Sequence, residues 1–181
     1  MALLPLSSYA GAYRDRPTGL SFPDQLGGMT RGEATEFEKD HPGLGVGILY
    51  RSPNPAIYAD IYIYNLGIKS IPTGSNTKEI HDQWKQAEGD IYTLEKQGKY
   101  KSVKKLYEAS TLLGMDRNAP TALRADFSYA SLGTKKLSYL YLLGYKNNFI
   151  KIRFTFPDTL KTEGEKIMRD FTTEFGKLIS K

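Results

Sequence analysis

One stretch of the sequence, Tyr58 to Tyr64, places a single carboxylate among tyrosines and is the first candidate for chemistry. Successive side chains of a β-strand point to opposite faces, so a strand here would put Asp60 on a tyrosine-lined face. Such an aspartate could be a buried acid in a pocket, with a raised pKa. The alternative is a structural carboxylate at the sheet margin, hydrogen-bonded to a neighbouring tyrosine or arginine. The ligand-contact residues that we predict around this position are Tyr58, Asp60, Tyr62, Tyr64 and Arg153.

A second aromatic and basic set surrounds Arg153. Phe149, Lys151 and Arg153 alternate along one predicted strand. The tyrosines of the preceding strand that we place beside them are Tyr139, Tyr141 and Tyr145. Such a face resembles an RNA-recognition sheet, but the stretch around Phe149 lacks the glycines of that signature. We therefore expect this face to pack against a covering helix, with Lys151 and Arg153 extending to its rim, and we expect no nucleic-acid binding.

Glycines recur at every second position in Gly43-Leu44-Gly45-Val46-Gly47. A phosphate-binding loop needs G-x-G-x-x-G at the start of a helix, whose N-terminal amides meet the phosphate. Here a strand pattern and then a turn follow the glycines. We interpret them as a smooth strand face that a helix or an aromatic ring can approach.

Residues that commonly bind metals are scarce. A histidine-based metal site needs ligands at helical or hairpin spacing, whereas His41 and His81 are far apart and are the only histidines. The sequence has no cysteine, which excludes disulfides, thiolate catalysis and cysteine-ligated metals. It also lacks the nucleophile-elbow, zinc-protease and EF-hand motifs. We predict no metal, no cofactor and no enzymatic activity; the alternative is a small enzyme with an acid-based pocket around Asp60.

The elements that must position these residues are organised around residues 136–157, which read as two strands joined by a polar turn at residues 146–148. The strand before the turn is apolar on both faces, as expected of a strand that is covered on both sides in the middle of a sheet. The strand after it alternates with period two. One of its faces would carry Ile150, Ile152, Phe154 and Phe156.

Further strands are predicted at residues 20–23, 29–37, 44–50, 56–64, 100–110 and 121–131. Two long segments instead show the apolar spacing of an amphipathic helix. We expect Asn76 to cap the first, with Glu79 in the capping box, and either Asp158 or the pair Thr162/Glu165 to cap the last. The apolar stripes are Ile80, Trp84, Ala87, Ile91 and Leu94 in the first, and Leu160, Gly164, Ile167, Met168, Phe171, Phe175, Leu178 and Ile179 in the last.

This order predicts an α+β domain, with one antiparallel sheet of about seven to eight strands between two long amphipathic helices. It resembles the PsbP/Mog1-type fold, an α/β/α sandwich. The resemblance rests on the strand FIKIRFTFP running into a long C-terminal helix, and on the short strand Leu20-Ser21-Phe22-Pro23. It covers residues 20–181 and includes no catalytic or ligand motif. Families of this type are mostly non-enzymatic accessory or binding proteins, which is what the resemblance implies here.

The chain divides into an irregular lead-in at residues 1–17 and a single domain at residues 18–181, which is an ordinary domain size. No apolar run reaches the roughly 20 residues that span a bilayer. The start lacks the basic region and the long apolar region of a signal peptide. Two explanations fit: a cytoplasmic protein, or a mature exported chain with a new initiating methionine. The polar segment at residues 7–16 favours export to an envelope compartment such as the periplasm.

Together these observations predict a non-catalytic, exported accessory or binding protein that contacts a small ligand or a protein partner through its tyrosine-rich sheet face. The formal net charge of +5 favours anionic partners only slightly. A second alternative, beside the Asp60 enzyme, is weak binding of an anionic polymer through lysines that would protect an edge strand. These are Lys99, Lys101, Lys104 and Lys105.

Overall fold

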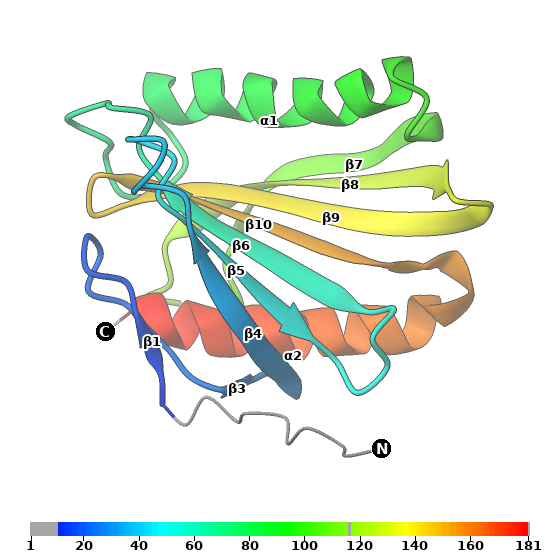
Figure 1. Cartoon of the computed structure of the whole chain (residues 1–181), viewed down its shortest axis with the longest axis horizontal. Helices are drawn as coiled ribbons and strands as arrows, with labels where there is room; N and C mark the ends of the chain where they lie inside the picture. Colours follow the sequence, from blue (N-terminus) through cyan, green and yellow to red (C-terminus); the bar gives the residue numbers. More distant parts are fainter. Residues whose placement is uncertain (1–10, 116, 181) are drawn as a thin grey trace.

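An eight-stranded antiparallel sheet forms the centre of the molecule in a computed structural model, which describes residues 11–115 and 117–180 (Figure 1). The strand order is β3-β4-β5-β6-β10-β9-β8-β7. The strands are β3 (Gln25–Leu26), β4 (Met29–Glu36), β5 (Val46–Arg51), β6 (Tyr58–Tyr64), β7 (Lys101–Leu112), β8 (Thr121–Ser131), β9 (Thr134–Tyr145) and β10 (Asn148–Pro157).

The sheet lies between two helices, one on each face (Figure 1). Helix α1 is Lys78–Lys96, and helix α2 is Lys161–Ile179, which follows the 3₁₀ turn η1 (Asp158–Leu160). The predicted α+β class and antiparallel sheet are therefore confirmed. Among the residues that the structure describes, no helix is both long enough and apolar enough to cross a membrane.

The hairpin of β9 and β10 occupies the middle of the sheet, as predicted. Lys146 and Asn147 form its two-residue turn with φ angles of 45° and 59°. This left-handed backbone matches the twist of the strands that it joins. The register places Ile152 opposite Tyr141 and Phe154 opposite Tyr139, so these four side chains share one face.

That face packs against α2 and forms the larger apolar core. Phe171 of α2 contacts Phe154 with ring centroids 5.9 Å apart and Tyr50 with centroids 5.4 Å apart. Phe175 is likewise fully buried. The expectation that the terminal helix covers the isoleucines and phenylalanines of β10 is met.

The opposite face packs against α1 through a smaller core. Trp84 and Ile91 of the helix stripe are buried there with Phe127 and Phe149 of the sheet. Leu94, the last residue of the predicted stripe, is only half-buried. The apolar cover of α1 is therefore shorter than the helix itself.

Both predicted helix caps are wrong. Thr77 stands at the N-cap of α1 in place of Asn76, and Leu160 stands at that of α2; neither donates or accepts a side-chain cap hydrogen bond. Thr162 lies inside α2, because η1 leads directly into the helix. Burial of an amphipathic face contributes most of a helix's stability in a protein, so these helices form without side-chain caps.

The predicted lead-in falls partly outside the described residues, which begin at residue 11. Its described part contains β1 (Tyr13–Arg14), where irregular structure was expected. β1 pairs with β2 (Ser21–Phe22) as a separate two-stranded ribbon, so the single predicted sheet is corrected to a sheet and a ribbon. The ribbon forms because the turn between its strands folds β2 back onto β1 instead of onto the main sheet.

Candidate functional site

The register of β6 and β10 brings the predicted ligand-contact residues together on the α1 face of the sheet. Asp60 lies directly opposite Arg153, and Tyr62 lies opposite Lys151. Tyr58 is half-buried on the same face, two residues before Asp60 in β6. The sequence pattern predicted this grouping because the alternation in each strand fixes which side chains share a face.

Tyr64 belongs to the α1 core rather than to the open part of this face. It is 7% exposed. Its hydroxyl accepts a hydrogen bond from Gln83 Nε2 at 3.0 Å, and its ring lies 5.5 Å from that of Phe149. This tyrosine therefore has little surface left for a ligand.

The tyrosines of β9 lie on the other side of the sheet, so their predicted grouping with Lys151 and Arg153 is wrong. Tyr139 and Tyr141 contact the guanidinium of Arg124, whose Cζ is 5.3 and 5.6 Å from their ring centroids. Tyr139 also donates a hydrogen bond to Glu165 of α2. The hairpin register decides the matter, because the even-numbered residues of β10 pair with the odd-numbered residues of β9.

Cations stacked on tyrosine rings are the main feature of the predicted site. Arg153 Cζ lies 5.3 Å from the ring centroid of Tyr100 and 5.7 Å from that of Tyr129. Lys151 Nζ lies 4.9 Å from the ring centroid of Tyr62. These distances fall within the range of cation–π attraction.

The guanidinium of Arg153 is also held by hydrogen bonds to Ser138 and Tyr129. Its Nε donates to Ser138 Oγ at 3.0 Å, and one terminal nitrogen donates to the Tyr129 hydroxyl at 3.4 Å. Tyr129 stacks on Tyr100 with ring centroids 4.0 Å apart. These bonds and rings fix the guanidinium of Arg153 in position. A third cation lies nearby on β5, where Arg51 Cζ is 5.7 Å from the ring centroid of Tyr58.

A small cavity of about 130 Å³, which we call the Asp60 cavity, lies between this face and α1. Its lining consists of Asp60, Tyr62, Ala87, Asp90, Ile91, Leu140, Lys151 and Arg153. Burial raises the pKa of Asp60 above its ordinary value, while Arg153, Arg51 and Lys151 act in the opposite direction. Burial also lowers the pKa of the Lys151 ammonium. The cavity thus contains an acid and a base whose charged forms are both disfavoured by desolvation.

The other sequence candidates are accounted for by local structure. His41 and His81 are both exposed, and the described residues contain no group of three or more acidic, histidine or cysteine side chains placed to hold a metal. Lys105 is paired with Glu88 and Glu108, whereas Lys99, Lys101 and Lys104 are exposed.

The glycine-rich loop meets a carboxylate of its own chain. Gly43 and Gly45 have φ angles of 91° and 59°. Their backbone N–H groups both donate to Glu38 Oε2, at 2.9 Å each. A Cβ on Gly45 would come within 1.8 Å of the Ile63 carbonyl oxygen. Gly43 and Gly45 precede β5 and permit a close approach of two backbones. Gly47 lies in β5, where an added Cβ would come within 3.0 Å of the Phe37 ring, so the predicted approach of an aromatic ring holds there.

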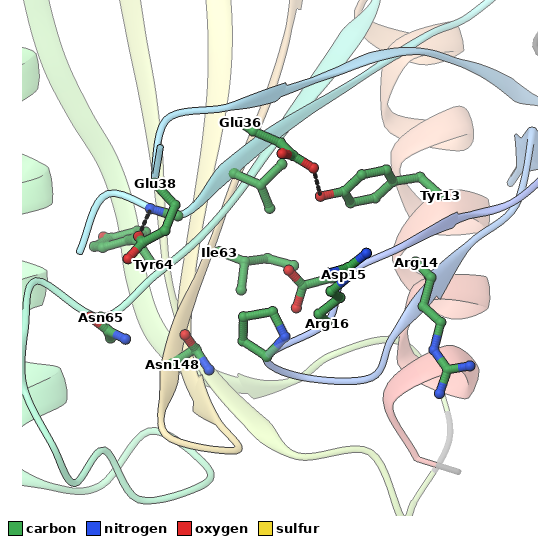
Figure 2. Close-up of a pocket in the computed structure, with 13 residues that line it drawn as sticks. Tyr13, Arg14, Asp15, Arg16, Glu36, Glu38, Ile63, Tyr64, Asn65 and Asn148 are labelled. Atoms are coloured by element: carbon green, nitrogen blue, oxygen red, sulfur yellow. Dashed lines mark hydrogen bonds between the residues drawn. The ribbon is translucent and has the colours of Figure 1, made fainter. Parts of the chain in front are cut away.

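A second and larger cavity, which sequence reasoning missed, lies on the side of the sheet opposite the Asp60 cavity, between β1 and the strand ends (Figure 2). We call this cavity of about 440 Å³ the N-terminal cleft. Its lining consists of Tyr13, Arg14, Asp15, Arg16, Pro17, Glu36, Glu38, Gly45, Val46, Ile63, Tyr64, Asn65 and Asn148. β1 and the turn at residues 15–17 form one wall, and the ends of four strands of the main sheet form the other. No local sequence pattern indicates which distant segments will meet in this way.

Comparisons with known proteins extend to fold alone. No protein-family model and no curated protein matches the chain. The chain is similar to the solution structure of cyanobacterial PsbP (CyanoP) from Synechocystis sp. PCC 6803, with 9% sequence identity, a TM-score of 0.57 and 96% of each chain covered. The fold is therefore PsbP-like, which confirms the predicted resemblance.

Proposed function

We propose that this chain, with its PsbP-like fold, is a non-catalytic binding protein. It contacts a partner at the Asp60 cavity and at the tyrosines around it, which we call the tyrosine rim (Tyr58, Tyr62, Tyr100 and Tyr129). The observation that carries this proposal is the set of cations held on tyrosine rings around Asp60, with Arg153 fixed by Ser138 and Tyr129. Half-buried side chains on a sheet suit recognition, since their geometry needs little reorganisation on binding.

The size of the cavity favours binding over catalysis. Pockets that enclose small-molecule substrates usually measure about 300–1,000 Å³. The Asp60 cavity, at about 130 Å³, accommodates little more than the head of one side chain. We therefore favour a protein partner over a small ligand. One side chain of that partner would enter the cavity.

The charges favour an acidic side chain from that partner. Lys151 and Arg153 balance Asp60 and Asp90 within the cavity lining. Arg51 adds a further positive charge beside Tyr58, so cations are in excess at the rim. A planar guanidinium such as that of Arg153 is suited to hydrogen-bond a carboxylate. Tyrosine rings beside it would pack against an aromatic or aliphatic stem.

Phenylacetate is a suitable test molecule because it joins a carboxylate to an aromatic ring. We expect it to shift the backbone amide signals of Asp60, Tyr62 and Arg153 in ¹⁵N-labelled protein, with a dissociation constant on the order of millimolar. Arg153→Met keeps the apolar stem but removes the guanidinium, and should weaken binding by about fivefold or more. Arg14→Gln, on the exposed N-terminal ribbon, is the matched control and should leave the constant unchanged.

Two results would count against this function. Phenylacetate shifts that are equal in the wild type and in Arg153→Met would show that the guanidinium does not recognise the carboxylate. Turnover of any compound in a generic substrate panel, if Asp60→Asn abolished it, would favour the enzyme alternative instead.

We also propose that the protein is exported, on the basis of the polar segment at residues 7–16 and the PsbP-like fold. Fractionation of the source cells, followed by antibody detection, tests this. Recovery in the cytoplasmic fraction would contradict it.

A further inference from the structure

The N-terminal cleft is assembled from parts of the chain that are distant in sequence. The turn after β1 is held by Asp15, whose backbone N–H donates to the Leu20 carbonyl at 2.9 Å. Lys146 of the central hairpin donates from Nζ to the Thr18 carbonyl at 3.0 Å and fixes the ribbon against the sheet. These bonds hold the turn after β1 in place beside the sheet.

The floor of the cleft is apolar. Val46 of β5 and Ile63 of β6 are opposite each other in the sheet and both line the cavity. The cleft lies within the usual volume range of small-molecule sites, about 300–1,000 Å³. An apolar floor with polar groups on the walls is also the usual composition of such sites.

Two almost completely buried side chains in the lining have acceptor oxygens without a hydrogen-bond donor among the described residues. Asp15 is 3% exposed, and only its Oδ2 accepts hydrogen bonds, from the Thr18 backbone N–H and hydroxyl. Asn148 is 5% exposed, and its Nδ2 donates to the Lys146 carbonyl at 2.8 Å while its Oδ1 accepts no hydrogen bond.

Figure 2 shows the orientation of these groups. The Asp15 carboxylate points toward Ile63, into the cleft, and the Asn148 carbonyl oxygen is turned toward the same space. Both oxygens are accessible from the cleft and are not fully enclosed, so they are available to a hydrogen-bond donor that enters it.

Carboxylates outnumber cations around this space. Glu36 accepts a hydrogen bond from the Tyr13 hydroxyl through Oε1 alone, and Glu38 bonds the glycine loop through Oε2 alone. With Asp15, these make three carboxylates, against the guanidinium groups of Arg14 and Arg16. Figure 2 shows that Arg14 is directed away from the cavity. Asn65 adds an amide, whose Oδ1 already accepts from the Gly67 N–H.

We propose that the N-terminal cleft binds a small organic amine in its cationic form. The ammonium donates hydrogen bonds to Asp15 Oδ1 and Asn148 Oδ1 and is attracted by Glu36. The apolar body of the amine lies on Val46 and Ile63. This site is independent of the function proposed at the Asp60 cavity, from which it is separated by the thickness of the sheet.

Phenethylamine tests the proposal directly, because it has an ammonium on a short apolar body. In ¹⁵N-labelled protein at low ionic strength, it should shift the Asn148 side-chain amide signals and the backbone amides of Asp15 and Ile63. Glu36→Gln preserves the acceptor for Tyr13 and removes one charge; it should weaken binding by about fivefold. Arg16→Gln removes a competing cation and should strengthen binding by about twofold.

Phenethyl alcohol and phenylacetate are the matched neutral and anionic controls. Neither should shift the cleft signals at concentrations where phenethylamine saturates them. The proposal is overturned if phenethylamine leaves these signals unmoved, if the alcohol binds equally well, or if neither variant changes the affinity. Circular dichroism melts of both variants confirm that they are folded. A failure here leaves phenylacetate binding at Arg153 unaffected, so the two proposals are tested separately.

Discussion

The two faces of the sheet carry cavities of opposite character. On the α1 face, the Asp60 cavity is small, and its lining charges balance while Arg51 adds a cation at the rim. On the α2 face, the N-terminal cleft is more than three times larger, and carboxylates exceed cations around an apolar floor. The comparison shows that one sheet can present opposite electrostatic preferences, because successive residues of the same strand, such as Tyr62 and Ile63, face different layers.

The two cavities also differ in how they are built. The Asp60 cavity is formed by neighbouring strands and the helix above them, so its rim is rigid and its cations are stacked on rings. The cleft is bounded on one side by β1 and the turn that follows it, which are held by the bond from Lys146 and by burial of Leu20 and Phe22 in the larger core. The cleft therefore depends on contacts between distant parts of the chain, whereas the Asp60 cavity depends on neighbouring strands and the helix that covers them.

The largest effect is expected from Gly45→Ala, at the wall of the cleft. The added Cβ would lie 1.8 Å from the Ile63 carbonyl oxygen at a φ of +59°. We expect a loss of about 2–3 kcal/mol in the free energy of unfolding, measured by urea denaturation. Gly89→Ala on α1 is the matched control, because nothing lies within 4 Å of its added Cβ. It should instead raise the free energy of unfolding by about 0.5–1 kcal/mol. Equal effects at both glycines would contradict the close packing of β5 and β6.

A smaller effect, with a defined pH dependence, is expected from Asp60→Asn. Burial raises the pKa of Asp60 in the folded state, so its contribution to stability is full below the ordinary pKa of 3.8 and declines as pH rises through the folded pKa. The variant should therefore be more stable than the wild type at pH 7, and the difference should disappear in acid. Urea midpoints measured from pH 3 to pH 8 check this. A variant that is less stable than the wild type at pH 7 would show that Asp60 is held by ion pairs instead.

The smallest effect, of opposite sign, is expected from Asp24→Asn beside the ribbon. Hydrogen bonds from Arg31, at 2.7 Å, and from the Gly11 N–H lower the pKa of this carboxyl. Its contribution is present above 3.8 and is lost as pH falls through the folded pKa, so the variant should be slightly less stable at pH 7. Because the Asp24 side chain is 45% exposed, added salt should reduce the difference. The same series of urea midpoints, with and without salt, measures it; a stabilised variant would contradict the sign.

Most of the sheet could be predicted from the sequence because side chains of different character alternate strictly along β5, β6 and β10, so that each face of these strands can be recognised. The grouping of Asp60 with Arg153 followed from that alternation. The face of Tyr139 and Tyr141 was assigned wrongly, because both faces of β9 are apolar or aromatic and only the register with β10 decides between them.

Other features could not be predicted because they depend on contacts between distant segments. The cap positions of both helices follow from the loops that precede them and not from the sequence pattern alone. The N-terminal cleft needs the ribbon to dock against the central hairpin, through a bond that joins Lys146 to Thr18, 128 residues apart. Asn148 in particular could not be recognised as a cleft residue from the sequence, because its position in the cleft depends on β1 and the turn that follows it.

The most direct test of opposite preference is one ¹⁵N-labelled sample that receives phenylacetate and phenethylamine in turn. Phenylacetate should move the amide signals of Asp60 and Arg153 while those of Asp15 and Asn148 remain in place, and phenethylamine should do the reverse. If both compounds moved the same set of signals, ring burial and not charge would govern binding, and the contrast between the two faces would be refuted.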